Sequence, residues 1–191
     1  MVLARLFRRR PFEREGFLLY GAAVAAAREP LFYLDYGAPD TMAGRFDLVC
    51  LHVALLIRRI RLDPDPAARD LAQAVFDAMF HDMDVNLREM GVGDLAVGPR
   101  VRKLWEAFHG RARAYEAALE EPGPEGLAAA LLRNLYAGRA PADPRVLPAL
   151  AAHARALAAV LAEQDMAALR RGEVRFAPPP PLAPLAEESQ P

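Results

Sequence analysis

Apolar side chains recur along this chain at alternating steps of three and four residues, the spacing of one face of an α-helix. The repeat is clearest on either side of a glycine-containing corner at 91–93. Before the corner, the stripe consists of Phe76, Phe80, Met83, Leu87 and Met90. After it, the stripe consists of Val101, Leu104, Phe108, Ala112, Tyr115 and Leu119. This pattern predicts two amphipathic helices joined by a tight turn, with Gly91 in the left-handed position that ends the first helix.

Prolines, glycines and capping residues set the limits of the predicted helices. We expect helices over about 12–28, 41–61, 66–90, 99–120, 125–136 and 144–171, with an extended or irregular linker at 31–41. The linker aromatics Phe32, Tyr33 and Tyr36 should pack on the body or form part of a partner groove, because such a cluster is costly in water. Trp105 is expected in the core. Gly91, Gly93 and Gly110 are expected to shape the corner, Gly110 by allowing another backbone to approach.

No segment shows the alternation typical of a β-strand. The predicted fold is therefore all-α: a single compact helical domain of about six helices at 12–171, with a basic segment at 1–11 and a flexible proline-rich tail at 172–191. The composition, 53% hydrophobic and 26% charged over 191 residues, suits one globular domain. The only cysteine, Cys50, excludes an internal disulfide and is expected to be a buried apolar residue.

The charge pattern limits the possible partners. A net charge of −1 and the lack of a basic stripe interleaved with aromatics argue against nucleic-acid sequence recognition. The first residues combine apolar side chains with Arg5, Arg8, Arg9 and Arg10. This segment could rest weakly on an anionic membrane surface, at about 1 kcal/mol per nearby arginine, or be a solvated tail or a presequence. We expect a cytoplasmic protein that is peripheral to the inner membrane.

The sequence contains no nucleophile motif, phosphate-binding loop or dinucleotide fingerprint. Its strongest enzymatic feature is His52 with the pair His81-Asp82, a spacing similar to that of HD-type metal hydrolases. One His-Asp pair arises often by chance, so no catalytic residue and no metal site are assigned. Haem ligation by one of the four histidines, His52, His81, His109 and His153, has no supporting motif either, and no cofactor is predicted.

Two segments carry distinctive motifs: 76–119 contains LREMGVGD at 87–94 and AFHGRARAY at 107–115, and 44–59 reads GRFDLVCLHVALLIRR. Both segments, the first more strongly, resemble the ubiquinol–cytochrome c chaperone family, the assembly factors of the cytochrome bc1 complex. The resemblance extends from Gly44 to about Gly138. His109 departs from it, since the family usually has an aromatic residue there.

This resemblance implies an all-helical, non-enzymatic chaperone that binds newly made cytochrome b near the membrane and assists its assembly and haem insertion. For mitochondrial relatives it also implies a small partner protein and the ribosomal tunnel exit, and ribosome proximity stays open for this chain. The alternative is a general helical adaptor without a respiratory client.

A chaperone of a membrane protein needs apolar surface together with charges that set orientation. The candidate client-binding residues lie around the corner: Asp82, Asp84, Arg88, Glu89, Asp94, Lys103, Phe108, Arg111 and Tyr115. The structural alternative is that Glu89 or Asp94 caps the helix that follows the corner and that Arg111 is paired internally. The residues themselves favour neither interpretation.

Overall fold

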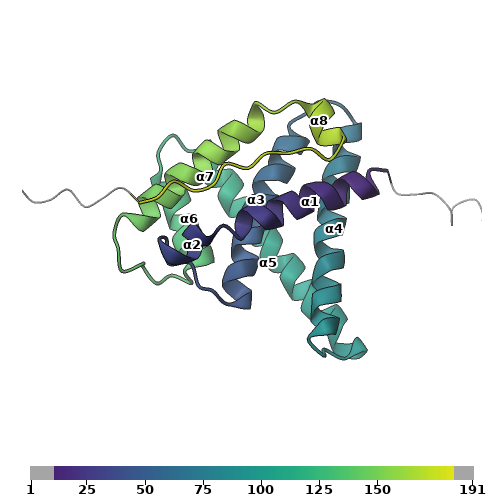
Figure 1. The fold of residues 1–191 in the computed structure, drawn as a ribbon, viewed down its shortest axis with the longest axis horizontal. Helices are drawn as coiled ribbons and strands as arrows, with labels where there is room; N and C mark the ends of the chain where they lie inside the picture. Colours follow the sequence, from purple (N-terminus) through teal and green to yellow (C-terminus); the bar gives the residue numbers. More distant parts are fainter. Residues whose placement is uncertain (1–10, 183–191) are drawn as a thin grey trace, which may run out of the picture.

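The computed structural model describes residues 11–182. The predicted membrane-contact residues Arg5, Arg8, Arg9 and Arg10 lie outside this range. The described part is compact and contains helices and no strand, which confirms the all-α prediction (Figure 1). Its helices are α1 (Glu13–Ala27), α2 (Pro30–Leu34), α3 (Met42–Arg61), α4 (Ala67–Glu89), α5 (Asp94–Glu120), α6 (Glu125–Leu135), α7 (Val146–Ala162) and α8 (Met166–Arg170).

Helix α3 forms the centre of the molecule. It is buried from Asp47 to Leu56 and packs against α1, α4, α5, α6 and α7. Such a helix needs apolar residues on most of its sides, which the sequence of α3 provides. Thr41 caps its first turn by accepting a hydrogen bond from the Gly44 backbone N–H at 3.2 Å. Cys50 lies fully buried in this helix, as expected.

Helix α1 crosses α4 at very close range. A Cβ atom on Gly16 would lie 2.6 Å from the backbone of Ala74, so a larger side chain at position 16 would force the helices apart. Further along, the Tyr20 hydroxyl donates a hydrogen bond to the Asp82 carboxylate at 2.6 Å. Burial and this bond raise the pKa of Tyr20. One candidate client-binding residue, Asp82, therefore also holds α1 against α4.

The linker at 31–41 is more ordered than predicted, because α2 forms within it. Pro30 occupies the first turn of α2, where a missing N–H costs nothing, so the proline that ends α1 also begins α2. Phe32 and Tyr36 are fully buried and Tyr33 is partly buried against the core, so the linker aromatics pack on the body.

The single helix expected over 144–171 is divided into α7 and α8. Asp165 caps α8 by accepting a hydrogen bond from the Ala167 N–H at 3.1 Å. The Arg59 guanidinium reaches across from α3 and donates to the carbonyl oxygens of Leu161 and Gln164 at 2.9 and 2.7 Å. Arg59 therefore ties α3 to the C-terminal end of α7, where the Leu161 carbonyl also accepts a hydrogen bond from the Gln164 N–H at 3.2 Å.

Residues 172–182 are not a free tail, contrary to the expectation for 172–191. Figure 1 shows this segment turning back after α8 and running along α7. Pro180 accepts a hydrogen bond from the Tyr36 hydroxyl at 2.8 Å, and the ring of Phe176 lies 5.7 Å from that of His52. The segment therefore covers part of the core; residues 183–191 lie outside the described range.

Candidate functional site

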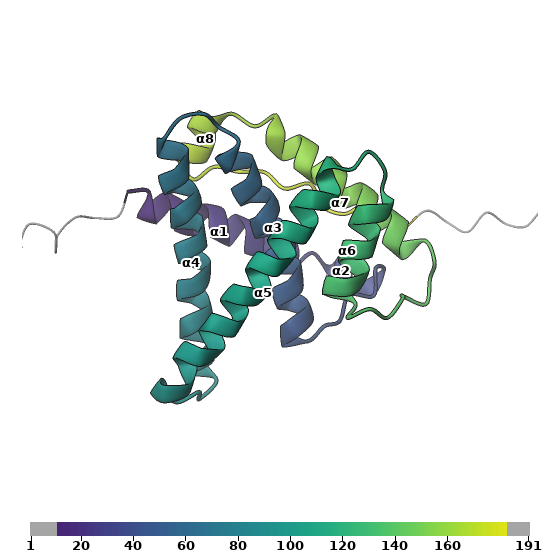
Figure 2. The ribbon, with the colours of Figure 1, turned by 180° about the vertical axis from the view of Figure 1, so that it is seen from behind.

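Helices α4 and α5 form an antiparallel hairpin whose closed end projects beyond the other helices (Figures 1 and 2). The turn depends on Gly91, whose φ of 79° is costly for other residues. Its N–H bonds the Arg88 carbonyl at 2.9 Å, and the Val92 N–H bonds the Leu87 carbonyl at 3.0 Å. This hydrogen-bond pair ends a helix through a left-handed glycine, as predicted for Gly91.

The other two corner glycines have different surroundings. Gly93 precedes α5 with a negative φ of −64°. A Cβ atom on Gly110 would meet no atom within 4 Å, so the close backbone approach expected there is wrong. Helix α5 also begins at Asp94 rather than near Pro99, because a proline close to the start of an exposed helix removes only one backbone hydrogen bond.

Arg88 joins the two sides of the turn. Its guanidinium contacts Asp84 on α4 at 2.6 Å and also the carboxylate of Asp94, the first residue of α5. The hydrogen bond from Arg88 lowers the pKa of Asp84. Ion pairs this exposed stabilise a fold weakly, so the three side chains still present charge at the surface. Glu89 and Lys103 are exposed nearby.

Large apolar side chains are exposed along the same hairpin. Leu95 is 98% exposed, Met90 49% and Trp105 46%, and Val85 is exposed as well. The prediction of a buried Trp105 is wrong: its ring packs against His109 at 4.1 Å between centroids, but almost half of the residue is exposed. A projecting end that combines exposed apolar groups with charges is typical of a protein-binding surface.

Three of the candidate client-binding residues lie in the interior instead. Phe108 and Tyr115 are 3% and 1% exposed, and Phe108 packs against Phe76 at 5.6 Å between ring centroids. Arg111 pairs with the buried Asp47 at 2.7 Å, the internal pairing considered above. Burial raises the pKa of Asp47 to about 6, against the opposing effect of Arg111. These residues join α5 to α3 and α4.

A hollow of about 360 Å³ lies between α1, α3 and α4, beside the hairpin. Three methionines line it, Met42, Met83 and Met90, and Asp82 and Glu89 contribute carboxylates. Flexible methionine side chains let one surface fit apolar partners of different shapes. Met42 and Leu95 were not predicted as site residues. Their positions beside predicted turns, where a core stripe ends, could have identified them.

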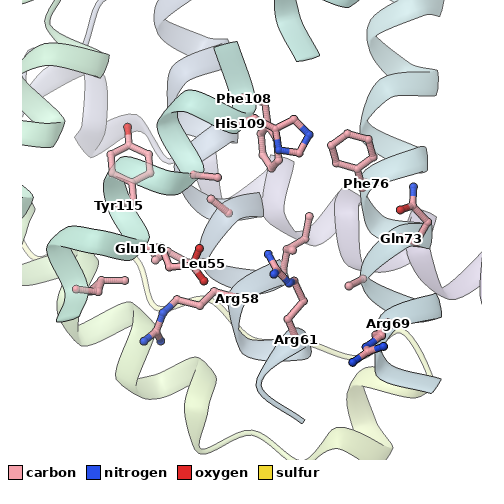
Figure 3. Close-up of a pocket in the computed structure, with 15 residues that line it drawn as sticks. Leu55, Arg58, Arg61, Arg69, Gln73, Phe76, Phe108, His109, Tyr115 and Glu116 are labelled. Atoms are coloured by element: carbon pink, nitrogen blue, oxygen red, sulfur yellow. The ribbon is translucent and has the colours of Figure 1, made fainter. Parts of the chain in front are cut away.

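A second hollow of about 280 Å³ lies on the other side of the hairpin, between α3, α4 and α5. Figure 3 shows Phe76, Phe108 and His109 on one side of it and Arg58, Arg61 and Arg69 on the other. Burial lowers the pKa of His109, and the charges of Arg113 and Arg61 lower it further. His109 is therefore neutral near pH 7 and serves as an aromatic residue in this wall, although it departs from the family pattern.

Of the remaining histidines, His81 lies apart from the two in the core. His81 is exposed and packs edge-on against Phe17 at 5.6 Å, whereas His52 and His153 are buried in the core. Within residues 11–182 no group of three or more His, Cys, Asp or Glu side chains is arranged to hold a metal ion. The spacing that resembles HD-type hydrolases does not become a ligand cluster there. None of the helices described is both long and apolar enough to cross a membrane.

Comparison with known proteins agrees with this architecture. The family described as ubiquinol-cytochrome C chaperone matches residues 34–176. Protein CBP3, mitochondrial, from Saccharomyces cerevisiae is 28% identical over 150 residues, which make up 78% of this chain and 44% of that protein. This chain therefore corresponds to less than half of the yeast protein.

The crystal structure of the Cbp3 homolog from Brucella abortus is also similar. It shares 36% sequence identity with a TM-score of 0.76, and the match covers 92% of this chain and 97% of that chain. The family match and this likeness extend over most of the sequence. The chain therefore belongs to the ubiquinol–cytochrome c chaperone family.

Proposed function

We propose that this protein is a non-enzymatic assembly chaperone of the cytochrome bc1 complex and that it binds newly made cytochrome b. Family membership over residues 34–176 is the observation that carries the proposal. The projecting α4–α5 hairpin supports it, because its exposed apolar residues lie beside fixed charges. The client is a membrane protein, so the chaperone would act at the cytoplasmic face of the inner membrane.

The proposed client surface consists of the hairpin end and the adjoining methionine-lined hollow. It includes the exposed Leu95 and Trp105 together with Met42, Met83 and Met90. The charges Asp84, Arg88, Glu89, Asp94 and Lys103 would orient the client. Phe108, Arg111 and Tyr115 would support this surface from within the core.

Capture of the client in the native host tests the proposal. A tagged wild-type chain should co-purify with cytochrome b, and deletion of the gene should lower the amount of assembled bc1 complex. Leu95→Asp should weaken capture about tenfold or more, because loss of a central apolar contact in an interface costs about 2 kcal/mol or more. Lys103→Glu should weaken capture with an unchanged thermal melting curve.

Leu34→Asp is the matched control, since Leu34 is 79% exposed on α2, away from the hairpin. It should capture cytochrome b as the wild type does. A wild-type chain that captures no cytochrome b, in a host whose bc1 complex survives the deletion, would favour a general adaptor. If both Leu95→Asp and Lys103→Glu captured cytochrome b as fully as the wild type does, the hairpin would not be part of the client surface.

A further inference from the structure

The hollow between α3, α4 and α5 combines an apolar wall with cationic side chains. Its apolar lining includes Leu55, Phe76, Phe108 and Ala112. Arg61 ends α3 and Arg69 lies in the first turn of α4, so the short α3–α4 connection brings the two arginines to the same side of the hollow (Figure 3).

The two arginines differ from their neighbour Arg58. Arg58 is paired with Glu120 at 2.6 Å, whereas Arg61 and Arg69 are exposed and have no ion-pair partner among residues 11–182. The only carboxylate in the lining is that of Glu116. The hollow therefore carries a local positive charge, although the whole chain has a net charge of −1. This charge is complementary to an anion, and Arg recognises carboxylates with well-defined geometry.

The volume of the hollow indicates what could occupy it. At about 280 Å³ it lies at the lower end of the roughly 300–1,000 Å³ of sites that enclose drug-sized ligands. One or two large side chains would fill it, which suits a segment of polypeptide.

We propose that this hollow binds a segment of the client polypeptide in which a large apolar side chain lies beside carboxylates. The apolar side chain would enter between Phe76, Phe108 and Ala112, and the carboxylates would pair with Arg61 and Arg69. This inference rests on the chaperone function proposed above, and it adds a second contact surface on the face of the hairpin opposite the methionine-lined hollow.

Binding of designed peptides to the purified full chain tests this proposal without assuming the client's identity. The probes are short fluorescent peptides with a central Trp, Phe or Leu flanked by Glu, and matched peptides with Gln in place of Glu. We expect saturable binding of the Glu peptides, weakened by salt, and about tenfold weaker binding of the Gln peptides. Arg61→Glu with Arg69→Glu should weaken binding of the Glu peptides by a similar factor.

Two further variants separate charge from shape. Ala112→Leu keeps both arginines but fills the hollow, so it should also weaken binding. Arg133→Glu with Arg139→Glu makes the same charge change at exposed positions on and after α6, and should bind as the wild type does. Circular dichroism confirms that each variant is folded.

Equal binding of Glu and Gln peptides, no binding of either, or unchanged binding by the Arg61/Arg69 variant would overturn the proposal. Binding to phosphatidylglycerol vesicles that requires both arginines, without peptide binding, would instead identify a lipid site. Host capture of cytochrome b separates the two proposals. Capture that persists in the Arg61/Arg69 variant, together with a failed peptide assay, would refute this inference and leave the chaperone function standing.

Discussion

Two buried histidines flank one aromatic ring in the core. The rings of His52 and His153 lie 5.5 and 5.7 Å from that of Phe32. The Nδ1 atom of His52 is 2.8 Å from the Leu48 carbonyl, and its Nε2 atom has no partner among the described residues. A neutral imidazole that donates from Nδ1 fits these contacts. Burial lowers the pKa of His52 to about 4 and also lowers the pKa of His153.

This burial predicts that acid destabilises the protein. His52 in the unfolded chain takes up a proton near its ordinary pKa of 6.5, whereas in the folded protein it does so near 4. Stability should therefore fall as the pH decreases through this window. Between about pH 7 and pH 5, the free energy of unfolding of His52→Leu should fall by about 1–2 kcal/mol less than that of the wild type. Urea unfolding at the two pH values measures this difference.

Part of the pH dependence should remain in His52→Leu, since His153 shifts in the same direction. His81→Gln is the control, because His81 is exposed, and it should keep the wild-type slope. If His52→Leu and the wild type lost stability equally on acidification, His52 would not be the group responsible.

The hairpin shows which residue environments follow from periodicity. The stripe spacing put Phe76 and Phe108 each on the apolar face of its helix, and these faces meet, with 5.6 Å between the two ring centroids. It does not say where that face stops being covered. Met90 belongs to the same stripe and is half exposed, because the end of the hairpin extends beyond the helices that cover its base.

At the scale of the helices, boundaries set by local chemistry were predicted well. The turn at Gly91 lies where the sequence placed it, and α3 begins directly after Thr41, close to the predicted start. The start of α5 and the break between α7 and α8 were not predicted. The break is supported by Arg59, which lies about a hundred residues earlier in the chain, and no local pattern reports such a contact.

The α1–α4 crossing gives a test at the same scale. Gly16→Ala should destabilise the protein by about 1–3 kcal/mol, because its Cβ would lie 2.6 Å from the Ala74 backbone and the crossing would have to open. Gly21→Ala is the matched control on the same helix. A Cβ atom there meets no atom within 4 Å, so this change should stabilise by up to about 1 kcal/mol.

Chemical denaturation of the two variants measures the difference between them. A Gly16→Ala protein as stable as Gly21→Ala would show that α1 can move away from α4 at no cost. It would also mean that the small residues of α1 are not needed for the close crossing.

At the scale of the whole molecule, the segment at 172–182 is held against α3 and the residues that follow α2. Phe176 packs on His52 of α3, and Pro180 binds Tyr36, which follows α2. A proline-rich composition favours an extended backbone without internal hydrogen bonds. An extended segment can still be ordered when its side chains and carbonyl groups find partners on a folded body.

Phe176→Ala should therefore lower the free energy of unfolding by about 1–3 kcal/mol, less than for a fully buried phenylalanine because Phe176 is partly exposed. Arg175→Ala is the neighbouring control. The Gln164 side chain binds the backbone N–H and carbonyl of Arg175, both at 2.8 Å, and the Arg175 side chain is exposed. That change should stay within about 0.5 kcal/mol. Equal melting temperatures for the two variants would mean that the segment contributes no stability.

The helix type and the turn at Gly91 follow from the sequence, because each depends on residues within a few positions of one another. The family resemblance is likewise carried by two continuous segments, 44–59 and 76–119. The surface that binds a partner is of a different kind. Met42 and Met90 line one hollow, and Arg61 and Phe108 line another, although the residues of each pair are distant in sequence. Which apolar residues remain uncovered depends on how far each helix extends past its neighbours, and that is a property of the packed molecule.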